Sequence, residues 1–344
     1  MDFTAAFEES AASFGWKDKW KGWEVPTWVS EDGKRAIGVG VGVHGNADIG
    51  EDPTEGFVKL HPFGSVTVEM CIGETGGAQR HAIQKMVAEV MKVPFDGVQL
   101  VNSDTHGTGY DAGMIGSRGT ITMGTCAVRA ANDAKKKLLT LASEKLHMDA
   151  EELDTEDFLV FPKKNPQMRL PWIAITGTPE MTITGMGLYQ QNFDKPNFAL
   201  YFAEVEVNLE TGEVRLLRAL EGTDVGQIID PVNVRMQAEG SFGAAGADTA
   251  LFEEMVMDKK LGRFVSGNMI DYKWRTFNEF PPFDTVILES QFDTESFHAL
   301  GFGEISGSPA PSAILMAVSN AIGAEVKEYP TTPAVVLKAM GKIE

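Results

Sequence analysis

Glycine alternates with branched apolar residues at positions 37–43, and this pattern restricts the fold more than any other feature of the chain. The segment reads as a strand, and Gly38, Gly40 and Gly42 would lie together on one of its faces. Glycine weakens a strand unless something packs closely against its backbone. We therefore expect close packing on the glycine face.

Periodicity and turn residues predict further strands and helices. Strands are expected at 57–60, 66–70, 98–101, 199–209, 213–221 and 286–288. Helices are expected at 3–14, at 79–90, up to residue 146 after a start near 120, around 236–240, at 309–322 and at 333–340. These elements predict an α+β chain with mixed sheets and packed helices.

The order of the elements suggests three parts. Residues 1–30 are rich in tryptophan, which suits an N-terminal docking segment, with core packing as the alternative. Residues 31–195 are expected to form a first α+β subdomain, whose stretch 151–195 is irregular and proline-rich. Residues 196–344 are expected to form a second α+β subdomain.

The charge balance narrows the possible partners. The 344 residues include 49 acidic and 30 basic side chains, for a net charge of -19. Nucleic acids and anionic membranes attract positive surfaces, so neither is an expected partner. The N-terminus lacks signal-peptide features and no apolar run is long enough for a membrane span, so a cytoplasmic location is expected.

Cysteine and histidine do not define a metal site. Cys71 and Cys126 stand alone, and the six histidines show no ligand spacing. Free thiols are the expected state of the two cysteines. Any metal would have to be held through groups other than these side chains.

The segment Gly301-Phe302-Gly303-Glu304 places a carboxylate on a glycine-flanked turn. The glycines permit positive φ and close approach to a bound group. Ser308 reads as the cap and Pro309 as the first residue of an apolar helix that stops at Gly323. Apolar neighbours should raise the pKa of Glu304 and suit it to general-base catalysis. The alternative is that Glu304 caps the helix or pairs with a surface cation.

Two glycine-containing turns open helices and are candidate anion sites. Gly73–Gln79 offers backbone N–H groups at a helix N-terminus. The segment 116–120 adds hydroxyls and the guanidinium of Arg118, which suits a phosphate better. The alternative for each is a turn that binds no ligand. The small residues after Gln237 admit either another helix or a flat cofactor.

Taken together, six segments resemble the molybdopterin-binding subunits of the xanthine dehydrogenase and aldehyde oxidoreductase family of molybdenum hydroxylases. The segments, in the family's order, are 73–79, 111–118, 124–128, 224–231, 237–240 and 301–304. The resemblance implies the second molybdopterin-cofactor-binding domain of that fold, without the family's first half. Such a split arrangement is similar to the medium molybdopterin subunit of nicotinate dehydrogenase.

The resemblance also implies roles for individual residues. Glu304 would be the general base in hydroxylating an electron-poor sp² carbon, in an N-heterocycle or an aldehyde, with oxygen from water. Molybdenum would be held by the pterin dithiolene, with cytosine dinucleotide as the expected cofactor form. Residues implied in holding the cofactor are Gly76, Gly77, Ala78, Gln79, Gly116, Ser117, Arg118, Gly119, Thr120, Gln237 and Gly303.

The same resemblance implies several partners. One subunit would carry the missing N-terminal half, and others would carry the [2Fe–2S] clusters and FAD that receive the electrons. A small-molecule substrate and a dimer of such heteromers are also expected.

This chain departs from the family pattern at two places. The family usually has Gly-Gln-Gly where this chain has Gly76-Gly77-Ala78, so the middle amide is absent unless Gln79 replaces it. The family usually has one or two prolines after the glutamate, where this chain has Ile305-Ser306. The altered turn favours a catalytically silent scaffold as the second hypothesis. A third is an unrelated nucleotide-binding protein that uses 116–120.

Overall fold

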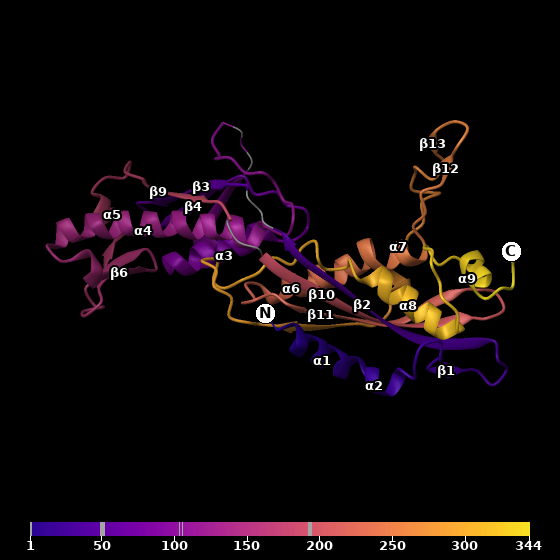
Figure 1. The fold of residues 1–344 in the computed structure, drawn as a ribbon. Coiled ribbons are helices and arrows are strands. Elements are labelled where there is room, and N and C mark those ends of the chain that lie inside the picture. The colour runs from indigo at the N-terminus through magenta and orange to yellow at the C-terminus, as the bar shows by residue number, and fades with distance from the viewer. Residues whose placement is uncertain (1, 49–51, 103, 105, 192–194) are drawn as a thin grey trace.

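Figure 1 shows two units side by side in the computed structural model, which describes residues 2–48, 52–102, 104, 106–191 and 195–344. The first unit spans residues 54–189 and contains a sheet with the strand order β5-β4-β3-β9. The second unit comprises residues 2–48 and 195–344, with a sheet in the order β1-β2-β10-β11-β14. The mixed sheets and packed helices confirm the predicted α+β class.

The described helices are α1 Phe3–Phe14, α2 Trp16–Lys19, α3 Gln79–Met91, α4 Gly124–Leu146, α5 Trp172–Thr176, α6 Pro231–Ser241, α7 Asp248–Leu251, α8 Ala310–Ile322 and α9 Pro333–Ala339. The described strands are β1 Trp28–Val29, β2 Arg35–Asp48, β3 Thr54–His61, β4 Ser65–Met70, β5 Val98–Asn102, β6 Leu153–Glu156, β7 Leu159–Pro162, β8 Leu170–Pro171, β9 Ile183–Tyr189, β10 Lys195–Asn208, β11 Val214–Asp224, β12 Met257–Asp258, β13 Arg263–Phe264 and β14 Phe283–Leu288. Wider π-helical turns, Gly119–Met123 and Phe242–Ala247, adjoin α4 and α7.

The glycine face of β2 receives α8. A Cβ atom on Gly38 would lie 2.2 Å from the Ala317 carbonyl oxygen, and one on Gly40 would lie 2.1 Å from that of Ala313. These distances are far below van der Waals contact, so a side chain could not fit without moving the helix. The close packing predicted from the glycine alternation is confirmed, and it fixes the helix that follows the Glu304 turn.

Pairing places β2 in the second unit. Arg35 pairs with Asn208 and Asp48 with Lys195, so β2 runs antiparallel to β10 along its whole length. Residues 35–48 therefore do not pair within the predicted first subdomain, 31–195. Local sequence could not reveal this, because the partner strand is distant in the chain.

Helices cover both faces of the second sheet. On one face, α8 and the turn after α6 bury Tyr201 and Phe242. On the other face, α1 buries Phe14 against Phe202. The sheet is mixed, because β10 and β11 are antiparallel whereas β11 and β14 are parallel.

In the first unit, α3 and α4 lie together on one face of the sheet, and the residues on the other face of β9 are exposed. The predicted hairpin of β3 and β4 is confirmed, and β5 joins β4 in parallel after α3. Strand β9 lies at the sheet edge within the predicted irregular region 151–195. Its Gly185 and Gly187 face α4, where added Cβ atoms would lie 2.2 Å from Ala130 oxygen and 2.0 Å from Cys126 oxygen.

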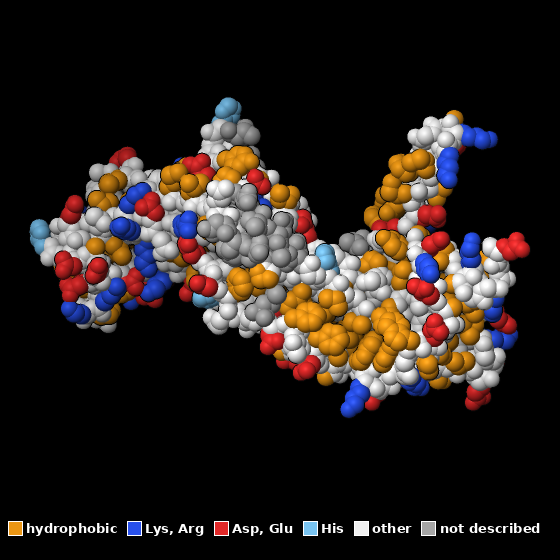
Figure 2. Space-filling model, viewed as in Figure 1, with side chains coloured by type: hydrophobic (Ala, Val, Ile, Leu, Met, Phe, Trp, Pro, Cys, Tyr) orange, Lys and Arg blue, Asp and Glu red, His pale blue; other side chains and the backbone are white. Residues whose placement is uncertain are grey.

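The N-terminal segment packs on the second sheet for most of its length. The predicted helix 3–14 is confirmed, and Trp16 stacks on Trp20 and meets the ring of Phe202 edge-on. Trp23 remains 73% exposed. Figure 2 shows apolar side chains gathered on this face of the second unit.

A hairpin containing β12 and β13 projects away from the second unit (Figure 1). Apolar side chains line it in Figure 2, and Leu261, Phe264 and Val265 are among those exposed. In the described part of the chain, no helix is long and apolar enough to cross a membrane.

Candidate functional site

Four loops and one helix meet at a pocket between the two units. The loops are those before α3, α4, α6 and α8, and the helix is α6. The predicted residues that line the pocket are Gly77, Ala78, Gln79, Ser117, Gly119, Thr120, Gln237 and Gly303. An adjoining hollow is lined by Glu304 and Arg118 together with Gly77, Gln79, Ser117, Gln237 and Gly303. The predicted Gly76 and Gly116 belong to the same turns but do not contribute to either lining.

In the turn before α3, the carboxylate of Glu74 binds the backbone N–H groups that were expected to bind an external anion. Gly76 and Ala78 both have positive φ, 98° and 58°, which orients successive N–H groups inward. Both N–H groups donate to Oε1 of Glu74 at 3.0 Å. This carboxylate therefore occupies the backbone donors that the sequence analysis assigned to an external anion.

The side chain of Gln79 lies against Gly77, the position where the family usually has glutamine. A Cβ atom on Gly77 would lie 2.2 Å from Nε2 of Gln79. The Gln79 amide thus fills the space that a side chain at position 77 would need. Its Oε1 atom is buried and has no hydrogen-bond partner among the described residues.

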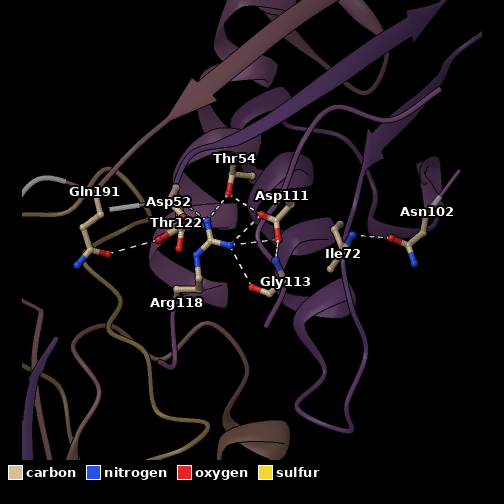
Figure 3. Close-up of polar contacts among 9 residues, drawn as sticks. All are labelled: Asp52, Thr54, Ile72, Asn102, Asp111, Gly113, Arg118, Thr122 and Gln191. Atoms are coloured by element: carbon tan, nitrogen blue, oxygen red, sulfur yellow. Dashed lines mark hydrogen bonds and ion pairs between the residues drawn. The ribbon is translucent and has the colours of Figure 1, made fainter. Parts of the chain in front are cut away.

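Arg118 clamps its own loop rather than presenting its guanidinium to the pocket (Figure 3). Its Nη1 donates to both carboxylate oxygens of Asp111 at 3.1 Å and to the Gly113 carbonyl at 3.0 Å. Its Nη2 donates to the Thr54 hydroxyl at 2.7 Å and to the Asp52 carbonyl at 3.0 Å. Arg118 is 1% exposed. The expected guanidinium fork for phosphate is therefore already engaged inside the protein.

Ser117 joins the loop before α4 to the Glu304 turn. Its Oγ accepts a hydrogen bond from the Glu304 N–H at 2.8 Å. A Cβ atom on Gly301 would lie 1.8 Å from the Ser117 carbonyl oxygen, so the two backbones touch at this point. Neither Gly301 nor Gly303 has positive φ, and the expected use of Gly301 is corrected: it admits Ser117 rather than a bound group.

The carboxylate of Glu304 is not enclosed by its apolar neighbours. Glu304 is exposed, whereas Phe302 and Ile305 turn into the core and are 7% and 2% exposed. The expected apolar surroundings are therefore wrong for this chain. The predicted cap is also wrong, because Pro309 holds the cap position of α8 and the Ser308 hydroxyl donates to the Glu304 carbonyl.

Helix α6 holds the turn from the other side. Gln237 Nε2 donates to the Gly303 carbonyl at 2.7 Å and to the Ser241 hydroxyl at 2.9 Å. The helix begins at Asp230, whose carboxylate accepts from the Asn233 N–H and from Lys85 of α3. Burial raises the pKa of Asp230, but these hydrogen bonds outweigh it and hold the pKa below its usual value.

The small residues after α6 serve close packing. A Cβ on Gly243 would lie 2.3 Å from the Phe280 ring, and one on Gly246 would lie 2.7 Å from Ala310. Of the two uses that the sequence left open, these contacts correspond to packing within the chain.

The sequence analysis missed one buried acid beside the site, Glu221 of β11. It lies opposite Tyr201 in the β10–β11 pairing and is 1% exposed. Its Oε2 lies 2.8 Å from the Tyr201 hydroxyl and 3.1 Å from the Ser306 hydroxyl. The sequence did contain a signal for this buried acid. Glu221 stands between Leu220 and Gly222 in a strand whose last residues are buried on both faces.

The lining of the pocket offers groups that suit a bound molybdopterin cofactor. Gln79 offers a buried acceptor without a protein partner, and such groups call for a bound donor. Gly303 has open space where a side chain would be, so its backbone faces the pocket. Within the described residues, no group of three or more His, Cys, Asp or Glu side chains could hold a metal.

The sequence matches the family model of the molybdopterin cofactor-binding domain over residues 11–281. The chain therefore belongs to the molybdopterin-binding molybdenum hydroxylase family, as the resemblance of the six segments indicated.

Curated relatives include two bacterial subunits. The chain is 28% identical to the gamma subunit of the 6-hydroxypseudooxynicotine dehydrogenase complex of Paenarthrobacter nicotinovorans, over 89% of this chain and 40% of the relative. It is 29% identical to the aldehyde oxidoreductase molybdenum-binding subunit PaoC of Escherichia coli O157:H7, over 94% of this chain and 43% of the relative. The chain thus spans less than half the length of these relatives.

Solved structures share the fold. Quinoline 2-oxidoreductase from Pseudomonas putida 86 matches with a TM-score of 0.81 at 22% identity, over 98% of this chain and 44% of that chain. CO dehydrogenase from Oligotropha carboxidovorans matches with a TM-score of 0.84 at 18% identity, over 99% and 45%. These likenesses confirm the predicted fold of a molybdenum hydroxylase domain.

Proposed function

We propose that this chain forms one half of the cofactor site of a multi-subunit hydroxylase and carries its general base. The reaction is hydroxylation of an electron-poor sp² carbon, in an N-heterocycle or an aldehyde, with oxygen from water. The observation that carries this proposal is the convergence of Gln79, Ser117, Gln237 and Glu304 on one pocket. Relatives named for 6-hydroxypseudooxynicotine and aldehyde substrates support the substrate class.

Each pocket residue has a task in this proposal. Gln79 and the backbone of Gly77, Gly119 and Gly303 hold the pterin, while Ser117 and Thr120 bind its dinucleotide, expected as the cytosine form. These residues would hold the molybdenum cofactor, which would supply the acceptor for the two electrons that leave the substrate carbon. Glu304 takes the proton from the attacking oxygen, and its exposed position leaves it accessible from the pocket rim.

The proposed partners rest on the family resemblance and on relatives that are named as subunits of complexes. We propose a partner subunit that supplies the remainder of the molybdopterin domain. Further subunits with [2Fe–2S] clusters and FAD would carry the electrons away, and the complex would dimerise.

Glu304→Gln tests the proposal in the complex purified with its partners. Loss of a general base lowers turnover roughly 100-fold or more, and the cofactor contacts are unaffected. Turnover should be followed on a panel of N-heterocycles and aldehydes, and molybdenum and pterin content should be measured in the same samples. Glu325→Gln is the matched control, because Glu325 is exposed and pairs with Lys327. Full activity of the Glu304 variant would exclude it as the base.

One observation favours the scaffold alternative. Glu74 occupies the N–H groups of Gly76 and Ala78, so the first turn holds its own anion. A scaffold would retain the fold and its partners without molybdenum. Absence of molybdenum from the fully assembled complex would therefore favour this alternative over the hydroxylase.

A further inference from the structure

The turn that carries Glu304 is tied to a buried carboxyl group beneath it. Glu221 lies inside the sheet of the second unit, and its Oε2 lies 3.1 Å from the Ser306 hydroxyl. Ser306 is 3% exposed and follows Glu304 by two residues. The first contact thus joins the sheet directly to the turn.

A second connection reaches the turn through α6. The Tyr201 hydroxyl lies 2.8 Å from Glu221 Oε2 and 3.4 Å from the Ala238 carbonyl oxygen. Ala238 adjoins Gln237, whose Nε2 donates to the Gly303 carbonyl. Both connections start at one carboxyl oxygen and end within four residues of chain, on either side of Glu304.

We propose that Glu221 is a positioning residue, which fixes the Glu304 turn through Ser306 and fixes α6 through Tyr201. The proposal rests on the function proposed above for Glu304. It also gives Ser306 a task at the place where the family usually has proline. The hydroxyl provides by hydrogen bonding the restraint that a proline ring would provide covalently.

The number of hydrogens available to these hydrogen bonds favours the protonated, neutral form of Glu221 over the ionised form. Tyr201 has one hydroxyl hydrogen, and the acceptors beside it include Glu221 Oε2 and the Ala238 carbonyl. The Ser306 side chain and the Gly307 backbone also hydrogen-bond to the Tyr201 hydroxyl. A protonated Glu221 donates to the Tyr201 oxygen, and the Tyr201 hydrogen is then available to Ala238. An ionised Glu221 only accepts, so one of these contacts loses its hydrogen.

The surroundings of Glu221 agree with a neutral group. Burial raises its pKa to about 8, although hydrogen bonds from Tyr201 and Ser306 lower it. Among the described residues, Tyr201 is the titratable side chain that hydrogen-bonds to Glu221, and no cation contributes to the pKa of Glu221. Burial and the neighbouring Glu221 raise the pKa of Tyr201 well above 10, so its hydroxyl keeps its hydrogen.

Backbone hydrogen exchange of residues 301–308, followed by mass spectrometry in the assembled complex, tests this inference. Ser306→Ala removes one hydrogen bond, so exchange in this segment should rise about fivefold relative to intrinsic rates. Glu221→Leu removes both connections and should raise it further. Glu221→Gln keeps a neutral group of the same shape and should retain slow exchange at pH 7.

The pH dependence separates positioning from a general loss of stability. In the unsubstituted protein, exchange in 301–308 should accelerate as the pH rises through about 8, after correction for intrinsic rates. Glu221→Gln should abolish this step. Thr223→Val is the matched control, because it removes a buried hydrogen bond to the Phe198 carbonyl on the same strand.

The outcomes distinguish this inference from the proposed function. Unchanged exchange in 301–308 for both Ser306→Ala and Glu221→Leu would overturn the positioning role, as would an equal effect of Thr223→Val. If the turn loosens as expected but Glu304→Gln remains active, the positioning role stands and the proposed base is wrong. If both hold, Ser306→Ala should lower kcat more than it changes KM.

Discussion

In each unit of this protein, a helix packs closely on glycines of one strand, but the two strands are paired over different lengths. In the second unit, α8 touches Gly38, Gly40 and Gly42 of β2, and β2 is paired with β10 over its full length. In the first unit, α4 touches Gly185 and Gly187 of β9, which is an edge strand. Strand β2 pairs with β10 along all 14 of its residues, whereas β9 pairs with β3 along only 7, so moving β2 away from its helix disturbs a longer ladder.

This difference predicts that a methyl group is tolerated less well in the second unit. Gly40→Ala should lower the free energy of unfolding by about 3 kcal/mol, because its Cβ would lie 2.1 Å from Ala313 oxygen. Urea unfolding of the full chain measures the loss, and hydrogen exchange should show α8 loosened more than α4. Gly45→Ala on the same strand is the control, since the nearest atom there is 3.9 Å away. Equal effects of the two changes would contradict the packing argument.

A matching change in the first unit should cost less. Gly187→Ala would place its Cβ 2.0 Å from Cys126 oxygen, yet β9 is held by a shorter ladder than β2, and we expect a loss of about 2 kcal/mol. The same unfolding and exchange measurements should now show α4 loosened more than α8. Met186→Ala, at the neighbouring exposed position, should change stability little. A larger effect at Gly187 than at Gly40 would reverse the comparison.

Two carboxyl groups, buried Glu221 in the second unit and half-buried Asp154 in the first, are stabilised in opposite ways. Glu221 lacks a cation and its pKa is raised to about 8, so its contribution to stability falls as the pH rises from about 4.5 to 8. Burial also raises the pKa of Asp154 in the first unit, but hydrogen bonds from Lys92 and Lys135 bring it to about 2. Its contribution is therefore present above pH 3.8 and is lost as the pH falls toward 2.

Asp154→Asn should give the smallest of these effects. At pH 7 we expect a loss of about 1 kcal/mol, because solvent partly screens the pair with Lys92. The loss should shrink as the pH falls below 3.8, where the unfolded state already protonates Asp154. Unfolding of the variant and the unsubstituted chain at pH 7 and pH 3 measures this, and a difference that grows in acid would contradict it.

Much of the fold followed from short-range patterns. The hairpin at Thr211-Gly212 and the helices 3–14 and 79–91 are close to their predicted bounds, because turn residues and apolar periodicity define them locally. Strand β9 was missed, since its two glycines stand in a proline-rich stretch. The placement of β2 with β10 was also missed, because register between distant strands leaves no local pattern.

In the site, too, local sequence predicted the loops but not the contacts between distant residues. Sequence singled out the loops that line the pocket, since glycine and small polar residues mark helix starts. It did not reveal what those loops bind within the chain. Arg118 is engaged by Asp111, and the donors of the first turn by Glu74, because such pairs depend on how the loops fold back. Glu221 was missed because its partners Tyr201 and Ser306 come from other elements.

The hydrogen bond from the Glu304 N–H to Ser117 has a consequence for the order of assembly. It joins residues 187 positions apart, one in each unit. Contacts across so long a loop form late in folding, because the chain must first lose the freedom of everything between them. We expect that neither unit alone can place the carboxylate. Glu304 would then reach its position only after both units have folded, and the cofactor site would be complete only at that stage.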